Sequence, residues 1–130
     1  MRTIANALDE FCNSFSIPAY SENTVPDTVD VPYLIYPIVE PEWNQKTPWH
    51  IQGWYRSKSN ADLYAKADEI VHAIGTGITI RTGSGFLVIY PDTPLIQTMV
   101  NGDFRSFYIS LSINNYQMPG AYIAPEEGDN

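Results

Sequence analysis

The clearest pattern of apolar and polar positions lies near the end of the chain. Every second residue of one stretch is apolar, namely Phe107, Ile109, Leu111 and Ile113. Small polar side chains occupy most positions of the opposite parity, namely Ser106, Ser110, Ser112 and Asn114. This alternation predicts an antiparallel strand with one buried face and one polar face. Helices can cover the apolar face, which leaves the polar face open to line a surface.

Turn signals divide the second half of the chain into two hairpins. The predicted strands are residues 78–81 with 86–90, and residues 95–100 with 104–114. Asn101-Gly102 separates the second pair, and Asn-Gly is the strongest short-range hairpin signal in a sequence. Glycines also occupy the loop of the first pair, at Gly83 and Gly85. Prolines at positions 91 and 94 predict a turn between the two hairpins.

Two further strands are predicted before these hairpins, at residues 33–39 and 49–56. The first contains Pro37, which places it at a sheet edge or at a bulge, because proline donates no ladder hydrogen bond. The connection from Glu40 to Pro48 is short, so antiparallel pairing of the two strands is expected. This 40–48 loop also carries Trp43, which we expect to be exposed.

Helical periodicity occurs twice. The first helix is predicted over residues 3–15, and its apolar face consists of Ile4, Leu8, Phe11 and Phe15. The second begins after a variant of the capping box, Ser59-Asn-Ala-Asp62, and ends before Gly75. Lys66 and Glu69 would face water. The buried stripe of the second helix would be Leu63, Ala67, Ile70 and Ile74.

Together these elements predict a single α+β domain over residues 1–124, with a mostly antiparallel β-sheet and two α-helices packed on one face. A chain of 130 residues is long enough to bury a core without disulfides. The one cysteine, Cys12, allows no disulfide within the chain. Residues 125–130 are acidic, and we expect this tail to be disordered.

The charge balance argues against tight binding of nucleic acid. Fifteen Asp and Glu oppose seven Lys and Arg, for a net charge of −8, and phosphate binding needs clustered cations. No uninterrupted apolar run approaches the roughly 20 residues that cross a membrane. The N-terminal residues also lack the pattern of a signal peptide. We therefore expect a protein of the reducing cytoplasm that neither enters a membrane nor wraps DNA.

Patterns for catalysis or metal binding are few. The histidines are His50 and His72. Asp68 and His72 lie four residues apart and could share a metal, but no third ligand follows at useful spacing. No glycine loop with the lysine of a phosphate-binding motif occurs, and no Gly-x-Ser-x-Gly elbow. We predict no enzyme activity, no metal and no cofactor. An enzyme that depends on one of the histidines is the weaker alternative.

Two protruding connections are candidate assembly surfaces. The first is the 40–48 loop, through Trp43, because exposed aromatic residues are common binding anchors. The second is the hairpin turn formed by Asn101, Gly102 and Asp103. Aromatic residues make up 13% of the chain. They either fill the core of a β-rich domain or serve interfaces, and both interpretations stay open.

Three segments carry a family resemblance: Asp30-Val-Pro-Tyr-Leu-Ile-Tyr36, Gln52-Gly-Trp-Tyr-Arg-Ser-Lys-Ser-Asn-Ala-Asp62, and Phe107-Tyr-Ile-Ser-Leu-Ser-Ile113. The predicted order of elements adds to it, with a short opening helix, a Pro-Tyr strand, and a strand that runs into a helix starting with Ser. In these features the chain resembles the tail terminator, or tail completion, proteins of long-tailed bacteriophages. The resemblance covers nearly all of residues 1–116.

This resemblance implies a structural protein that caps the growing tail tube as a ring of six and then joins the tail to the head. The implied partners are further copies of the chain, the tail tube protein and a head-completion or connector protein. DNA would pass through the ring without tight binding, which suits an acidic chain. The channel would be lined by Ser106, Ser110, Ser112 and Asn114. The implied location is the tail or neck of the virion, with assembly in the host cytoplasm.

Two other interpretations stay open. Another phage neck, connector or minor capsid protein would share the size, the charge and the lack of catalytic motifs. A non-phage α+β module that binds a partner would share them too. The 40–48 loop and the acidic tail have no counterpart in the family pattern.

Overall fold

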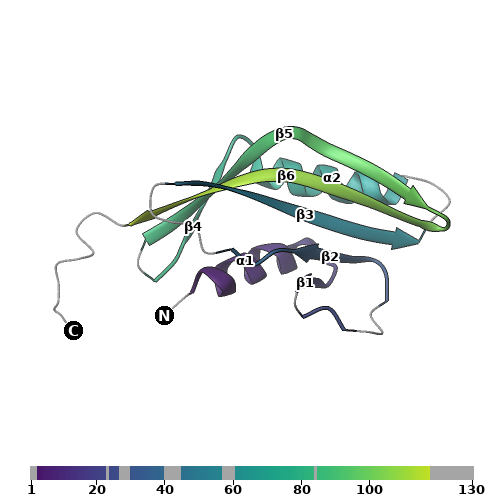
Figure 1. Ribbon diagram of the computed structural model, residues 1–130, viewed down its shortest axis with the longest axis horizontal. Coiled ribbons are helices and arrows are strands. Elements are labelled where there is room, and N and C mark those ends of the chain that lie inside the picture. Colours follow the sequence, from purple (N-terminus) through teal and green to yellow (C-terminus); the bar gives the residue numbers. More distant parts are fainter. Residues whose placement is uncertain are drawn as a thin grey trace.

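The computed structural model describes residues 3–22, 24–26, 30–39, 45–56, 61–83 and 85–117. In these parts of the chain, two α-helices, one short 3-10 helix and six strands follow one another (Figure 1). The elements are α1 (Ile4–Cys12), η1 (Asn13–Phe15), β1 (Ala19–Ser21), β2 (Tyr33–Tyr36), β3 (Lys46–Arg56), α2 (Ala61–Ile74), β4 (Ile78–Arg81), β5 (Gly85–Asn101) and β6 (Phe104–Gln117).

The strands form one curved sheet in the order β1-β2-β3-β6-β5-β4. The neighbours from β2 to β4 in this order pair antiparallel, whereas β1 pairs parallel with β2. The sheet is therefore mixed, and the prediction of a mostly antiparallel sheet is corrected at this edge. The sequence pattern does not indicate β1, because Pro18 marks a break and three residues are too few for a period of two.

The three long strands β3, β6 and β5 form the body of the sheet, with α2 behind them and α1 beside β1 and β2 (Figure 1). α2 contacts β6, β5 and β3, while α1 contacts η1 and β1. Buried side chains of both helices belong to the same core cluster as the buried side chains of β2, β3, β5 and β6. The apolar alternation predicted for β6 is confirmed, with all four apolar residues buried: Phe107, Ile109, Leu111 and Ile113.

The helix α1 begins after a side-chain cap at Thr3. The hydroxyl of Thr3 accepts a hydrogen bond from the backbone N–H of Asn6 at 3.0 Å, which satisfies one of the donors at the helix start. The helix is shorter than predicted and continues as η1. Ser16 then adopts a left-handed backbone conformation with φ of 69° and turns the chain toward β1.

The helix α2 buries the predicted stripe of Leu63, Ala67, Ile70 and Ile74. Its predicted ending is also confirmed, since Gly75 follows in the left-handed region with φ of 59°, and its N–H donates to the carbonyl oxygen of Val71. The predicted cap at Ser59 lies outside the described residues.

Lys66 was predicted to face water, and this prediction is wrong. Its side chain is 14% exposed, and its Nζ donates to the carbonyl oxygen of Phe15 and to Glu69 Oε1 at 2.8 Å. The long lysine stem thus carries the charge from α2 across to the end of η1. An i, i+3 pattern of charges on a helix cannot indicate this contact, because its acceptor is a distant backbone group.

The strand β3 starts at Lys46, so the predicted 40–48 loop is shorter than expected. The register places Pro48 opposite Ser112 of β6, at a point where β2 no longer pairs with the other side of β3. A proline is tolerated there, because its missing N–H leaves no ladder bond unmade. The pairing of β2 with β3 is antiparallel, as predicted.

The strand β5 runs without interruption through the turn predicted at residues 91–94, so that prediction is wrong. A bulge that contains Pro94 takes the place of the turn, and Pro91 is paired directly before it. Pro91 pairs with Leu111 and Ile96 with Ile109, so four residues of β5 lie opposite Ser110 alone. Both predicted hairpins nevertheless form, and they share this one strand.

Candidate assembly surfaces

The predicted channel residues lie on the side of the sheet opposite the core, which we call the open face. The register places Ser106 between Trp54 and Met99, and Ser112 between Pro48 and Tyr90. These large neighbours leave the two serines 1% and 0% exposed, respectively. The other two members of the set are partly exposed, namely Ser110 and Asn114. Of the four predicted channel residues, only Ser110 and Asn114 therefore offer side-chain surface to a channel within a single chain.

The bulge of β5 fixes a charged group on the open face. The carboxylate of Asp92 accepts hydrogen bonds from the hydroxyl of Ser112 and from the N–H of Thr93, both at 2.8 Å, and lies 3.6 Å from Nζ of Lys46. The hydrogen bond from Ser112, followed by that from Thr93, lowers the pKa of Asp92. The buried serine thus holds the bulge in place rather than facing solvent.

A second hydrogen-bond network lies next to the contacts of Asp92 on the open face. The hydroxyl of Tyr90 donates to Oδ1 of Asn114 at 2.8 Å, and the amide of Asn114 donates to the hydroxyl of Tyr116 at 2.9 Å. Tyr116 also stacks on Phe86 with ring centroids 5.3 Å apart. These contacts connect β5 with β6 and orient Asn114, so its amide is already engaged when it meets any partner.

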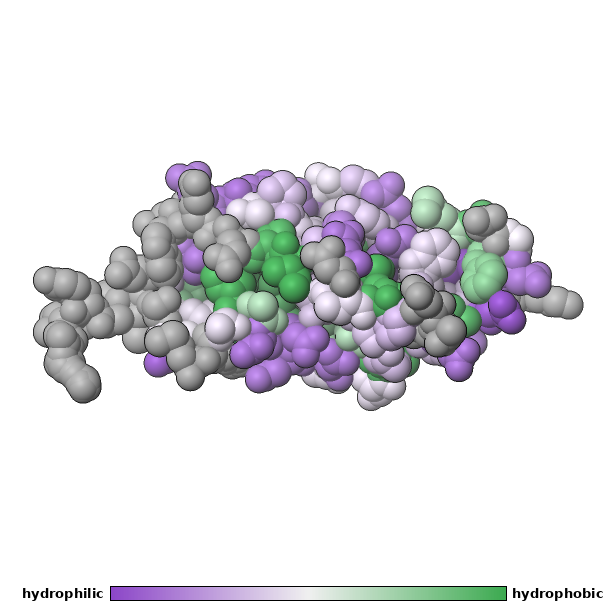
Figure 2. Space-filling view, turned by 60° about the horizontal axis from the view of Figure 1, so that its bottom comes forward, coloured by the Kyte–Doolittle hydropathy of each residue, from purple (hydrophilic) through white to green (hydrophobic). Residues whose placement is uncertain are grey.

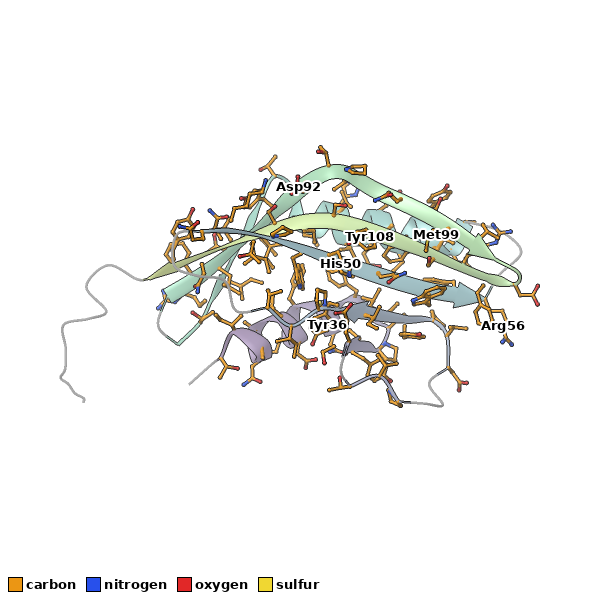
Figure 3. The ribbon with its side chains drawn as sticks, in the orientation of Figure 1. Tyr36, His50, Arg56, Asp92, Met99 and Tyr108 are labelled. Atoms are coloured by element: carbon orange, nitrogen blue, oxygen red, sulfur yellow. The ribbon has the colours of Figure 1, made fainter. Side chains whose placement is uncertain are left out.

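His50 and Tyr108 lie side by side near the middle of the open face (Figure 3). Their rings are stacked with centroids 4.4 Å apart. Burial lowers the pKa of His50 below its usual value, and the carboxylate of Glu22, 4.0 Å from Nε2, partly opposes the shift. The imidazole is therefore held mainly neutral near pH 7, as part of an aromatic surface.

The sequence pattern does not indicate this aromatic surface as a unit. Its members come from β3, β5 and β6 and meet only through the register, namely His50, Phe86, Tyr90, Tyr108 and Tyr116. A usable signal was present in β3, where Lys46, His50, Gln52 and Trp54 share one parity. The bulge in β5 hides the corresponding parity there, because it shifts the pattern of alternation midway along the strand.

The predicted hairpin is confirmed, but its turn is one residue shorter than predicted. Asn101 pairs with Phe104 as the last residue of β5, so the loop consists of Gly102 and Asp103. Gly102 adopts φ of 62°, which suits glycine at the first loop position of a type II′ turn. Phe104 follows, 37% exposed, and the guanidinium of Arg56 lies 4.8 Å from its ring centroid. This end of the hairpin is therefore exposed and partly apolar.

Trp43 and the acidic tail, the other predicted features of assembly, lie outside the described residues. Large apolar side chains that are exposed in the described part of the chain are Ile38, Tyr64, Met99, Val100 and Phe104. Figure 2 turns the lower side of Figure 1 toward the viewer and shows hydrophobic patches separated by hydrophilic residues.

An open groove of about 860 Å³ lies near the start of α2. It is lined by Asp30, Val31, Pro32, Tyr55, Arg56, Asp62, Ala65, Lys66, Glu69 and Phe104. Burial, together with the nearby carboxylates of Asp62 and Glu69, raises the pKa of Tyr55 to about 12. The phenol is therefore neutral at physiological pH. Charges of both signs line the groove, and Lys66 is already bound to its neighbours.

The candidate metal pair of Asp68 and His72 is not assembled as a site. Nδ1 of His72 lies 2.8 Å from the backbone carbonyl oxygen of Asp68, which is an ordinary contact within a helix. Among the described residues, no group of three or more His, Cys, Asp or Glu side chains is placed to hold a metal ion.

In the part of the chain that the structure describes, no helix is long and apolar enough to cross a membrane. Comparison of the chain with protein-family models and with curated protein sequences finds no match.

Proposed function

We propose that this chain is a structural protein of phage assembly, a tail terminator that caps the tail tube as a ring of six copies and joins the tail to the head. The observation that carries the proposal is the β5–β6 hairpin, which ends in the exposed Gly102-Asp103 turn beside Phe104. A hairpin that belongs to a six-stranded sheet presents its tip rigidly, as an assembly contact requires. The family resemblance supplies the number six.

In the proposed ring, both helices lie on one face of the sheet and the open face turns toward the channel. The shared core cluster of the two helices supports this arrangement. Ser110 and Asn114 would then face the channel together with the stacked pair of His50 and Tyr108. A net charge of −8 per chain would let DNA pass without adhering.

The proposed partners are the neighbouring copies, the tail tube protein, and a head-completion or connector protein of the phage neck. The proposed location is the virion, with assembly in the host cytoplasm. A different neck or connector protein would bind the portal instead of the tail tube, so co-purification with one or the other separates the two assignments.

The experiment combines the purified chain with tail tubes and images the tube ends. We expect closed rings with six times the 14.6 kDa mass of the chain. The variant Asp103→Lys reverses a charge at the hairpin tip and should reduce ring occupancy. Its matched control, Asp68→Lys, reverses an exposed charge on α2 and should assemble normally. If Asp103→Lys forms normal rings, the hairpin tip is not part of the interface between copies. Tight DNA binding by the single chain would overturn the proposal.

The groove beside α2 favours a second candidate, a partner-binding α+β module with no role in a phage. Its volume and its mixture of charged and aromatic lining suit a small polar ligand or a peptide. Ala65→Trp would fill this groove without removing any charged group. If a ligand found by screening loses affinity for Ala65→Trp while tail tubes recruit no chain, the second candidate replaces the first.

A further inference from the structure

The second half of β5 is a strand edge that has no partner among the described strands. β4 pairs with β5 only from Phe86 to Ile89, and β6 covers the other side of β5 as far as Asn101. Among the described strands, none pairs with the outer side of residues 95–100. Gln97, Thr98, Met99 and Val100 are all exposed there, the last two by 56% and 57%.

Features that prevent strands from joining are charged side chains, prolines, bulges and short length. The bulge of β5 lies directly before this edge, and regular pairing with β6 resumes at Ile96. Residues 95–100 contain no charge and no proline. Met99 and Val100 point to opposite faces, so the edge is apolar on both sides. An uncovered edge of this kind is a template for an additional strand.

The same sheet protects its other edges. Among the described strands, none pairs with residues 46–51 of β3 on the β2 side, and there Lys46 and Pro48 occupy the edge. β1 has three residues, and β4 has four and ends in Arg81. Because three edges are blunted and one is not, the β5 edge is the place where a strand can be added at full length.

A second copy of the same edge is the occupant that fits. Opposite residues in a continuous sheet share a face. Antiparallel self-pairing about Thr98 meets this condition, since it places Ile96 opposite Val100 of the second copy on the core side. On the open side, Gln97 lies opposite Met99 of the second copy, and no charged residue meets another.

Charge also favours this segment for contact between copies. Each chain carries −8, so two copies repel one another over most of their surfaces. The stretch from Thr93 to Gly102 has no charged residue, which removes repulsion between the paired strands themselves. Because a two-fold contact uses the same edge on both copies, it closes at two and leaves no β5 edge for further addition.

We propose that the free protein forms a two-fold dimer in which the β5 strands of two copies pair antiparallel about Thr98 and join the sheets into one. This dimer does not depend on the proposed ring. A ring uses two different surfaces of each copy, whereas the dimer uses one surface twice.

The test uses the full chain without tail tubes. Sedimentation equilibrium should give twice the 14.6 kDa chain mass at high concentration and the single mass on dilution. Thr98→Lys places like charges directly opposite each other at the two-fold axis and should raise the dimer dissociation constant by about tenfold or more. Thr79→Lys, on the exposed edge of β4, is the matched control and should leave it unchanged. Circular dichroism checks that both variants fold.

Crosslinking tests the register. Cys12 is 0% exposed, so a thiol introduced at Thr98→Cys is the accessible one in the described residues. Mild oxidation should yield a covalent dimer from Thr98→Cys and none from Thr79→Cys. A wild-type chain that stays single at every concentration would overturn the proposal. Dimers that crosslink through position 79, or that persist in Thr98→Lys, would overturn it equally.

Discussion

The hydroxyl of Tyr36 donates a hydrogen bond of 2.8 Å to the carboxylate of Asp9 and so ties β2 to α1. Asn13, the residue directly after α1, donates to the same carboxylate at 3.1 Å. Tyr36 is 2% exposed. Burial and the bound carboxylate both raise the pKa of Tyr36. This contact joins the first helix to a strand of the sheet by a directed bond in addition to apolar packing.

Removing that bond should destabilise the fold without creating a cavity. We expect Tyr36→Phe to lower the free energy of unfolding by about 1–2 kcal/mol, because the buried ring stays and a hydrogen bond to a charged group is lost. Urea denaturation followed by fluorescence measures this change in the free energy of unfolding. Tyr64→Phe removes a hydroxyl from an exposed tyrosine of α2 and serves as the control. Equal losses in both variants would show that the Asp9 contact contributes nothing.

The close packing of β3 on β6 leads to a second prediction. A Cβ atom at Gly53 would lie 2.4 Å from the ring of Phe107, which is fully buried. We expect Gly53→Ala to cost about 1–3 kcal/mol through overpacking. In Gly53→Ala/Phe107→Leu, the smaller side chain makes room for the methyl group. The double variant should therefore lose less than the sum of the two single losses in a double-mutant cycle.

The environment of His50 predicts a pH dependence. Its folded pKa lies below the usual 6.5, so the unfolded chain binds the proton more readily. The stability contributed by neutral His50 is complete above the unfolded pKa and declines as the pH falls toward the folded pKa. We expect the melting temperature to drop between about pH 7 and pH 5, and His50→Gln to drop less.

Substitution of Glu22 should increase the loss of stability on acidification, whereas His50→Gln should reduce it. The Glu22 carboxylate raises the pKa of His50 against the effect of burial. Glu22→Gln should therefore lower that pKa further and enlarge the loss of stability on acidification. If His50→Gln and Glu22→Gln both melt with the wild-type pH profile, His50 does not titrate in the predicted range.

The contact of Lys66 predicts an unusual cost for a lysine on a helix. Lys66→Met keeps the apolar stem and loses the bond to the Phe15 carbonyl oxygen. We expect a loss of about 1 kcal/mol. Glu69→Gln weakens only the exposed ion pair and should cost less. Leu63→Ala, which empties the buried stripe of α2, should cost about 2–5 kcal/mol. Chemical denaturation ranks the three, and a larger loss for Glu69→Gln than for Lys66→Met would contradict the assigned contact.

Features with strong local signals were predictable from the sequence. The stripe from Leu63 to Ile74 has helical spacing, and the alternation from Phe107 to Ile113 has the spacing of a strand, so both faces could be assigned. The hairpin near Gly102 follows from two residues whose backbone preferences favour a tight turn. In these places, local preference and tertiary packing agree.

Features set by tertiary pairing were not predictable. β1 consists of three residues, and its pairing with β2 is what makes it a strand. Residues 91–94 have the composition of a turn, yet pairing with β6 on both sides holds them in a bulge. Lys46 has no local signal for a strand, and it belongs to β3 because it pairs with Asn114. The aromatic surface that includes His50 and Tyr108 was not predicted for the same reason, because its members meet only once the register is set.

The pairing of β3 with β6 affects how the chain folds during synthesis. β3 leaves the ribosome long before its partner, since Lys46 pairs with Asn114 and Arg56 with Phe104. Until β6 emerges, the apolar side of β3, with Trp49 and Ile51, lacks the strand beside it. The β5–β6 hairpin closes over a two-residue loop and can form rapidly once made, whereas its docking onto β3 closes a long loop. The nascent chain therefore presents an uncovered apolar strand for much of its translation, a state that chaperones recognise.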